Sequence, residues 1–291
     1  MYKRQCPHHA KKAITDPISI LENFQYTIAL PPPSLYGQYN NLEEQDLLLE
    51  ALLGMGFDSV FEVAKAAELV SDATRRLLQT GSMKRPVISS ACPAVTRLIR
   101  VRFPELIDHV LPLVAPIELA ARMAKKDAVR KTGLPKEAIG CIFLTPCPAK
   151  VTATRSPVGS AHSEVDGAVA IKDIYPRLLA SMKRIQQVDY LASAGRIGLG
   201  WAESGGEAAG LVSTDSYLAA DGIENVIRVL EVSRARCCGI QTSPISPCWN
   251  WAAHAASALR GTAAWKRFCT SCRAWTAAAA ARPPARHWPK T

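Results

Sequence analysis

The 291-residue sequence has no apolar run that approaches the roughly 18 residues needed to span a bilayer. Its first residues, Met1 to Cys6, lack the apolar core of a secretory signal peptide. We therefore expect a cytoplasmic protein with no membrane partner. In that reducing compartment its nine cysteines are expected to be metal ligands or buried thiols rather than disulfides.

Acidic residues are absent from Val232 to the C-terminus. Nine of the 35 Lys and Arg residues lie in that stretch, which leaves 26 basic against 25 acidic residues in the first 231. The net charge of +10 therefore belongs to the tail. Because the rest of the chain is nearly neutral, its overall charge argues against nucleic acid as a partner.

Alternating strand and helix patterns predict an α/β fold with a largely parallel sheet. Strands are expected at 25–30, 58–63, 86–90 and 138–144, and helices at 41–55, 64–79, 93–101, 113–132, 173–184 and 224–231. The glycine-rich segment 195–206 is expected to be a loop. Ligands of open parallel sheets lie outside the carboxyl ends of the strands, so the segments that follow the predicted strands are the candidates for a site.

Two Cys-Pro-Ala turns, at Cys92 and at Cys147, each follow an apolar run. Proline suits the first position of a helix because its φ is fixed and its missing N–H is not needed there. A thiolate directly before it lies near free N–H groups and the positive end of a helix dipole. The repeated arrangement indicates two thiolates that bind one metal centre. The alternative is a pair of buried structural cysteines.

The residues around these cysteines resemble the C-terminal domain of the large chain of [FeFe]-hydrogenases, the iron-only hydrogenases. Ser89-Ser90-Ala91-Cys92-Pro93 is similar to the family's Thr-Ser-Cys-Cys-Pro motif, and Thr145-Pro146-Cys147-Pro148-Ala149-Lys150 to its Met-Pro-Cys-x-x-Lys motif. Pro32-Pro33-Ser34 resembles an Ala-Pro-Ser turn beside the cluster. The resemblance covers about 25–231. It implies the α/β fold of the H-cluster domain, with parallel or mixed sheets flanked by helices and incomplete at the C-terminus.

The resemblance implies specific roles for the matched residues. Cys92 and Cys147 would bind the [4Fe–4S] part of an H-cluster. Lys150 would hydrogen-bond a diatomic ligand of the two-iron part, and Pro33 and Ser34 would lie against the cofactor. A ferredoxin-type electron carrier or a signalling domain is the implied partner.

Two further cysteines have different expectations. Cys6-Pro7 resembles the last cysteine of a bacterial ferredoxin motif, so 1–24 is expected to be the remnant of a ferredoxin-like [4Fe–4S] domain with Cys6 as a metal ligand. Its three partner cysteines are absent, and Cys6 alone does not hold a cluster. Cys141 lies inside an apolar run and is expected to belong to the core.

The departures from the family pattern bear on function. The family's proton-carrying cysteine falls on Ala91, and the acidic residues of its proton path fall near Ala73 and Thr74. Because proton transfer needs a titratable group within reach, no residue is assigned a catalytic role. Hydrogen sensing or redox regulation is therefore favoured over fast turnover. A catalytic ferredoxin-linked hydrogenase and a metal-free structural or interaction protein are the alternatives.

The family's third motif, Cys-Pro-Gly-Gly-Cys, is absent after residue 231, where the composition also changes. We expect 232–291 to be a basic Ala-, Trp- and Cys-rich tail that is frameshifted or disordered. Reading the gene in its other two frames tests this, since a frameshift predicts a Cys-Gly-Gly-Cys-like stretch in one of them. Two alternatives are a zinc site that includes Cys269 and Cys272, and nucleic-acid binding by the tail's basic and tryptophan side chains.

Overall fold

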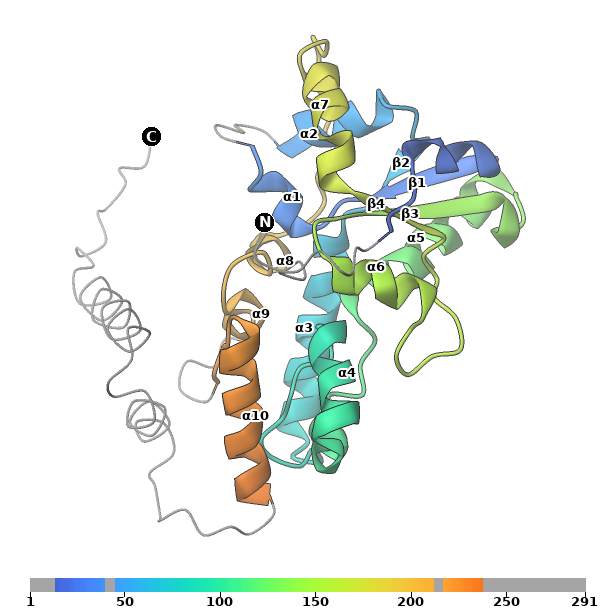
Figure 1. Cartoon of the computed structure of the whole chain (residues 1–291). Coiled ribbons are helices and arrows are strands. Elements are labelled where there is room, and N and C mark those ends of the chain that lie inside the picture. The colour runs from blue at the N-terminus through green and yellow to red at the C-terminus, as the bar shows by residue number, and fades with distance from the viewer. Residues whose placement is uncertain (1–13, 40–44, 212–216, 238–291) are drawn as a thin grey trace, which may run out of the picture. The chain divides into compact units, whose positions relative to one another are not determined.

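The computed structural model describes residues 14–39, 45–211 and 217–237. It contains one parallel sheet in the order β2–β1–β3–β4 (Figure 1). The strands are β1 (Tyr26–Leu30), β2 (Ser59–Val60), β3 (Ile139–Thr145) and β4 (Gly167–Ala170). β3 is buried along its whole length, as expected for a central parallel strand covered on both faces. The predicted α/β class is confirmed.

Helices cover both faces of this sheet. Figure 1 shows α2 (Gln45–Leu53) and α7 (Ile171–Met182) on one face, and α3 (Val63–Gln79) and α5 (Pro116–Thr132) on the other. Alternate strand residues point into two separate cores, with Ile142 in the first and Phe143 in the second. The helices predicted at these positions are confirmed.

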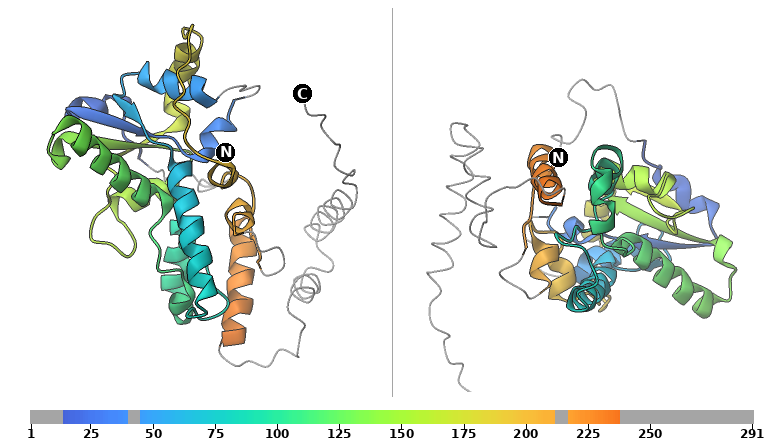
Figure 2. Two further views of the ribbon diagram at one scale, coloured as in Figure 1. Left: turned by 180° about the vertical axis from the view of Figure 1, so that it is seen from behind. Right: turned by 90° about the horizontal axis from the view of Figure 1, so that it is seen from below.

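A third apolar cluster lies beyond the sheet. It joins α4 (Pro93–Arg102), the short 3₁₀ helix η3 (Pro104–His109) and α10 (Ile223–Cys237), which Figure 2 shows from two further sides. Its buried members are Ile99, Phe103, Leu106 and Leu230. The helices predicted at 93–101 and 224–231 are confirmed, and the second of them continues to Cys237.

The strand predicted at 86–90 is wrong. This segment does not join the sheet, and its β-type pairing within the described residues is a single parallel bridge between Ile88 and Val110. Ile88 packs against the α4–η3 cluster rather than against a face of the sheet. The apolar side chain of Ile88 is therefore partly buried without the segment forming a strand.

The loop predicted at 195–206 is also wrong, because this segment contains α8 (Arg196–Gly200) and the start of α9 (Gly206–Ala209). Gly205 takes the left-handed backbone of a turn, with φ 78°, whereas Gly198 and Gly206 allow close packing. A Cβ on Gly198 would collide with the backbone carbonyl of Ala64 on α3, and one on Gly206 with the carbonyl of Gly200. The glycine-rich composition therefore reflects tight contact of this segment with α3 and with itself.

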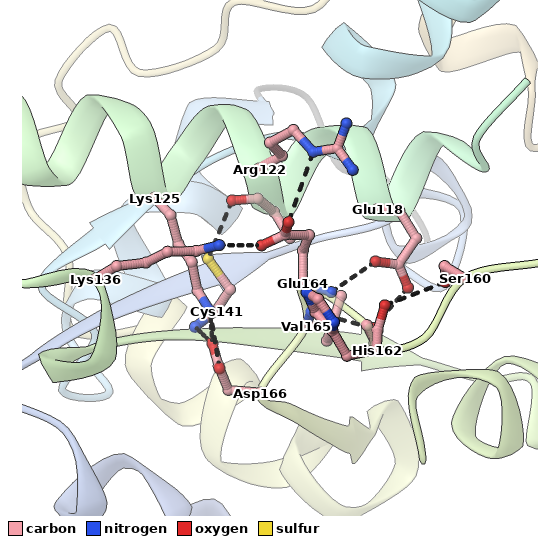
Figure 3. A network of polar contacts seen from close by, with 12 residues as sticks. Glu118, Arg122, Lys125, Lys136, Cys141, Ser160, His162, Glu164, Val165 and Asp166 are labelled. Carbon is pink, nitrogen blue, oxygen red and sulfur yellow. Dashed lines mark hydrogen bonds and ion pairs between the residues drawn. The ribbon is translucent and has the colours of Figure 1, made fainter. Parts of the chain in front are cut away.

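A charged network fastens the loop before β4 to α5 (Figure 3). Lys125 on α5, whose side chain is 8% exposed, donates to Asp166 at 2.8 Å. Asp166 also accepts the backbone N–H of Cys141 at 2.7 Å. Nearer the start of α5, Glu118 accepts the Ser163 hydroxyl at 2.6 Å. The network holds the connection between α6 (Pro148–Arg155) and β4 in place.

Replacing Asp166 by Ala should destabilise the fold by about 3–5 kcal/mol, because it leaves the buried Lys125 ammonium without its counter-charge. Urea unfolding measures the difference. Asp127→Asn on the same helix is the control, since Asp127 pairs with Arg130 at the surface and its loss should cost less than about 1 kcal/mol. Equal costs for the two variants would contradict a structural role for the Lys125–Asp166 pair.

Candidate metal centre

Cys92 and Cys147 occupy the same structural position in two different helices. Each is the residue directly before a helix whose first residue is proline, α4 for Cys92 and α6 for Cys147. Their backbones are nearly the same, with φ −99° and ψ 106° for Cys92 and φ −110° and ψ 114° for Cys147. The prediction that a helix begins after each Cys-Pro pair is therefore confirmed.

Cys147 lies at the carboxyl edge of the sheet, as predicted. It follows the end of β3, and its N–H donates to the hydroxyl of Thr145 at 3.1 Å. Pro33 and Ser34 begin α1 (Pro33–Tyr36), which follows the end of the neighbouring strand β1. Because β1 and β3 pair in parallel, these two residues and Cys147 lie at the same edge.

Cys92 is not at the end of a sheet strand, which corrects the prediction. Its turn is held by side-chain hydrogen bonds. The hydroxyl of Ser90 donates to the carbonyl of Leu113 at 2.8 Å, and the N–H of Ala91 donates to the hydroxyl of Ser89 at 3.1 Å. The Cys92 residue is exposed. The first cysteine is thus positioned by the segment that leads into α5 rather than by the sheet.

Glu207 is a candidate functional residue that the sequence did not reveal. It follows Gly206 on α9, and its carboxylate accepts the hydroxyl of Ser89 at 2.6 Å. Burial raises the pKa of the Glu207 carboxyl, and the Ser89 hydrogen bond and the charge of Lys150 offset this only in part. The only signal in the sequence was an acidic residue at the end of the glycine-rich segment. Glu207 links that segment to the turn before Cys92.

Lys150 lies one turn into α6, three residues after Cys147. Its ammonium is 5.9 Å from the centroid of the Phe143 ring and acts on the Glu207 carboxyl through its charge. Lys150 is therefore close in sequence to Cys147, which directly precedes α6. Its charge also acts on Glu207, which accepts the hydrogen bond from Ser89 in the turn before Cys92.

The described residues fit part of an iron–sulfur site. A cubane cluster takes four thiolates, and the chain offers two matched thiols, Cys92 and Cys147, each at a helix start that favours negative charge. Among the described residues, no three Cys, His, Asp or Glu side chains form a ligand group. The described part of the chain therefore does not complete a four-thiolate cradle.

The other cysteines that were singled out add no ligand within the described residues. Cys141 is fully buried in β3, and burial raises the pKa of its thiol to about 12. Its Sγ donates to the carbonyl of Ala121, and the prediction that it belongs to the core is confirmed. Cys6 lies outside the described residues, as do 1–13 and 238–291, which contain part of the predicted ferredoxin remnant and most of the predicted tail.

Comparison with known proteins decides the family. Residues 26–233 match the family described as iron only hydrogenase large subunit, C-terminal domain. The chain belongs to this family. The resemblance carried by the motifs around Cys92 and Cys147 is thereby confirmed.

The three proteins compared below with this member of the iron-only hydrogenase family have low sequence identity to it. The NADP-reducing hydrogenase subunit HndD of Solidesulfovibrio fructosivorans is 26% identical over 149 residues, which are 48% of this chain and 25% of that protein. The match thus spans a quarter of the curated relative. A solved [FeFe]-hydrogenase HydA1 variant from Chlamydomonas reinhardtii is 17% identical with a TM-score of 0.49, over 59% of this chain and 48% of that one. An apo HydA1 variant from the same organism is 15% identical with a TM-score of 0.48, over 76% and 56%.

Within the described ranges, no helix is both long enough and apolar enough to cross a bilayer.

Replacing Glu207 by Gln should change how the stability of the fold depends on pH. A carboxyl whose pKa is raised on folding contributes stability below its ordinary pKa, about 4.3, and this contribution is lost as the pH rises through the raised value. Gln does not titrate and still accepts a hydrogen bond from Ser89. We expect the urea midpoint of E207Q, relative to the original protein, to increase with pH.

The control for this measurement is Glu203→Gln, which changes an exposed carboxylate four residues earlier in the same segment. Its urea midpoint should follow the original protein across the pH range. Parallel profiles for E207Q and the original protein would contradict the burial of a titrating carboxyl at Glu207.

Proposed function

We propose that this chain is an iron–sulfur protein in which Cys92 and Cys147 are two ligands of a [4Fe–4S] cluster. The observation that supports it most is the shared position of the two thiols, each before a proline-led helix, in a chain of the iron-only hydrogenase family. Thiolates are the usual ligands of iron–sulfur clusters, and a helix N-terminus favours their negative charge. The remaining ligands come from outside the described residues.

We further propose that the site extends to the two-iron part of an H-cluster. When bound, that group supplies the chemistry that interconverts hydrogen with protons and electrons. Lys150 would donate a hydrogen bond to it, since its ammonium lies on the same helix as Cys147. Pro33 and Ser34 would lie against it from the neighbouring strand end.

A sensory or redox-regulatory role is favoured by the residues that stand where the family has its proton-carrying side chains. Ala91 carries no titratable group beside Cys92. On α3, where the resemblance places acidic residues, the chain has Ala73 and Thr74, and the Thr74 hydroxyl donates to the carbonyl of Val70. Proton transfer by the family's usual route is therefore interrupted at both points.

The partner we propose is an electron carrier or a signalling domain in the cytoplasm. The curated relative is named as part of an NADP-reducing hydrogenase, which favours an electron-transfer assembly with other subunits. Electrons would enter or leave the cluster through that partner.

A catalytic hydrogenase is the second candidate, and Glu207 favours it. Its carboxyl, with a pKa raised by burial, is hydrogen-bonded to Ser89 two residues before Ala91. A carboxyl with a raised pKa can hold and release a proton at this turn, where the alanine cannot. This would supply a proton route that does not pass through residue 91.

Anaerobic reconstitution with iron and sulfide tests cluster binding. We expect the original protein to take up iron and to show the EPR signal of a reduced [4Fe–4S] cluster. Cys92→Ser and Cys147→Ser should each lose most of the bound iron, because each removes a ligand. Cys141→Ala should keep the iron, since that thiol is buried in the core. A folded, iron-free original protein would overturn the proposal in favour of a metal-free structural role.

Hydrogen evolution distinguishes the two roles once iron binding is established. The protein is supplied with the two-iron centre, and its rate is compared with that of E207Q and of the control Glu203→Gln. A catalytic role in which Glu207 relays protons predicts a loss of about 10²-fold or more in E207Q, the usual contribution of a general acid or base. A slow rate that E207Q leaves unchanged supports sensing.

A further inference from the structure

The two cysteine-bearing helices are anchored in different parts of the fold. α6 contacts the sheet at β3 and β4, where Val151 is buried. α4 instead packs against η3 and α10 through Ile99 and Phe103, in the cluster that lies beyond the sheet. No apolar core among the described residues is shared by the two helices, but they lie directly against each other, so the contacts between them, including one hydrogen-bonded contact, set their relative position.

Arg97 provides that contact. It lies in the second turn of α4, and its guanidinium donates to the carbonyl of Ser156, the residue that ends α6. Among the described residues this is the hydrogen bond that joins the two helices. It also places a positive charge at the C-terminus of α6, where the helix dipole favours a cation.

The Arg97 residue is half-buried. Its Nε atom is buried and has no hydrogen-bond partner within the described part of the chain. A buried donor without a partner costs free energy, which the hydrogen bond from the same guanidinium to Ser156 offsets in part. Arg100, one turn further along α4, is exposed, and its side chain makes no hydrogen bond or ion pair with any residue that the structure describes.

We infer that Arg97 is a positioning residue for the metal centre, because its bond to Ser156 joins the second turn of α4 to the C-terminal end of α6. Arg97 is five residues from Cys92, or about 7.5 Å along the helix axis. Both helices are short, so fixing them at this contact also fixes the two thiols relative to each other. The inference rests on the proposed binding of one cluster by Cys92 and Cys147.

The test compares Arg97→Met with the matched control Arg100→Met on the same helix. Met keeps an apolar stem and removes the donor and the charge. We expect R97M to bind iron about 10-fold more weakly after anaerobic reconstitution, the size of effect typical for residues that orient metal ligands. Its EPR signal should broaden, whereas R100M should match the original protein. Arg97→Lys, which retains a cationic donor, should recover part of the affinity.

A second measurement does not depend on the metal. The second measurement uses a full-length variant in which every cysteine except Cys92, Cys147 and the buried Cys141 is replaced. A short thiol-to-thiol reagent such as dibromobimane then reports whether the thiols of Cys92 and Cys147 come close enough to be cross-linked. Cross-linking should be about 10-fold slower in R97M, as expected for the loss of one hydrogen bond from a charged donor, and unchanged in R100M. Circular dichroism confirms that each variant is folded.

The outcomes separate this inference from the proposed function. If the original protein binds iron and folded R97M matches it in affinity, EPR signal and cross-linking, the role of Arg97 is overturned while cluster binding stands. If the original protein binds no iron, the proposed function fails, and the cross-linking rates alone decide the role of Arg97. Equal rates in R97M and R100M would overturn it.

Discussion

The parallel pairing of β1 with β3 is the constraint on which the site depends. Five residue pairs, from Tyr26 opposite Ile139 to Leu30 opposite Phe143, keep the two strands in register so that both end at the same edge of the sheet. The turn with Pro33 and the turn with Cys147 are therefore brought to the same edge by the main-chain pairing of the two strands. The buried side chains of β3 fill both cores, so a one-residue shift in register would move each of them into the opposite core.

The other half of the site is built from side-chain contacts. The turn before Cys92 has no strand partner in the sheet and is instead held by Ser89 on Glu207, by Ser90 on Leu113 and, through α4, by Arg97 on Ser156. Such contacts are individually weaker and more easily altered than a strand register. The two thiols therefore have the same local geometry but supports of different kinds, side-chain contacts for Cys92 and the end of a sheet strand for Cys147.

The sequence predicts those parts of the fold that are determined locally. Long helices such as α3 and α5, the buried strand β3 and the helix start after Cys147 follow from apolar periodicity and from proline at the first helical position. The segment 86–90 was mispredicted because an apolar run does not show whether it is buried in a sheet or against a helix cluster. Glu207 was missed because its contact with Ser89 joins residues 118 positions apart. Neither propensity nor spacing reveals a contact of that kind.

The proposed metal centre requires that Cys92 and Cys147 bind iron together. A crystal structure of the anaerobically reconstituted protein, with anomalous diffraction collected at the iron edge, tests it most directly. Joint binding predicts an iron peak within bonding distance of the Sγ atoms of both cysteines, at the helix starts of α4 and α6. Iron bound elsewhere, or bound to only one of the two thiols, would contradict it.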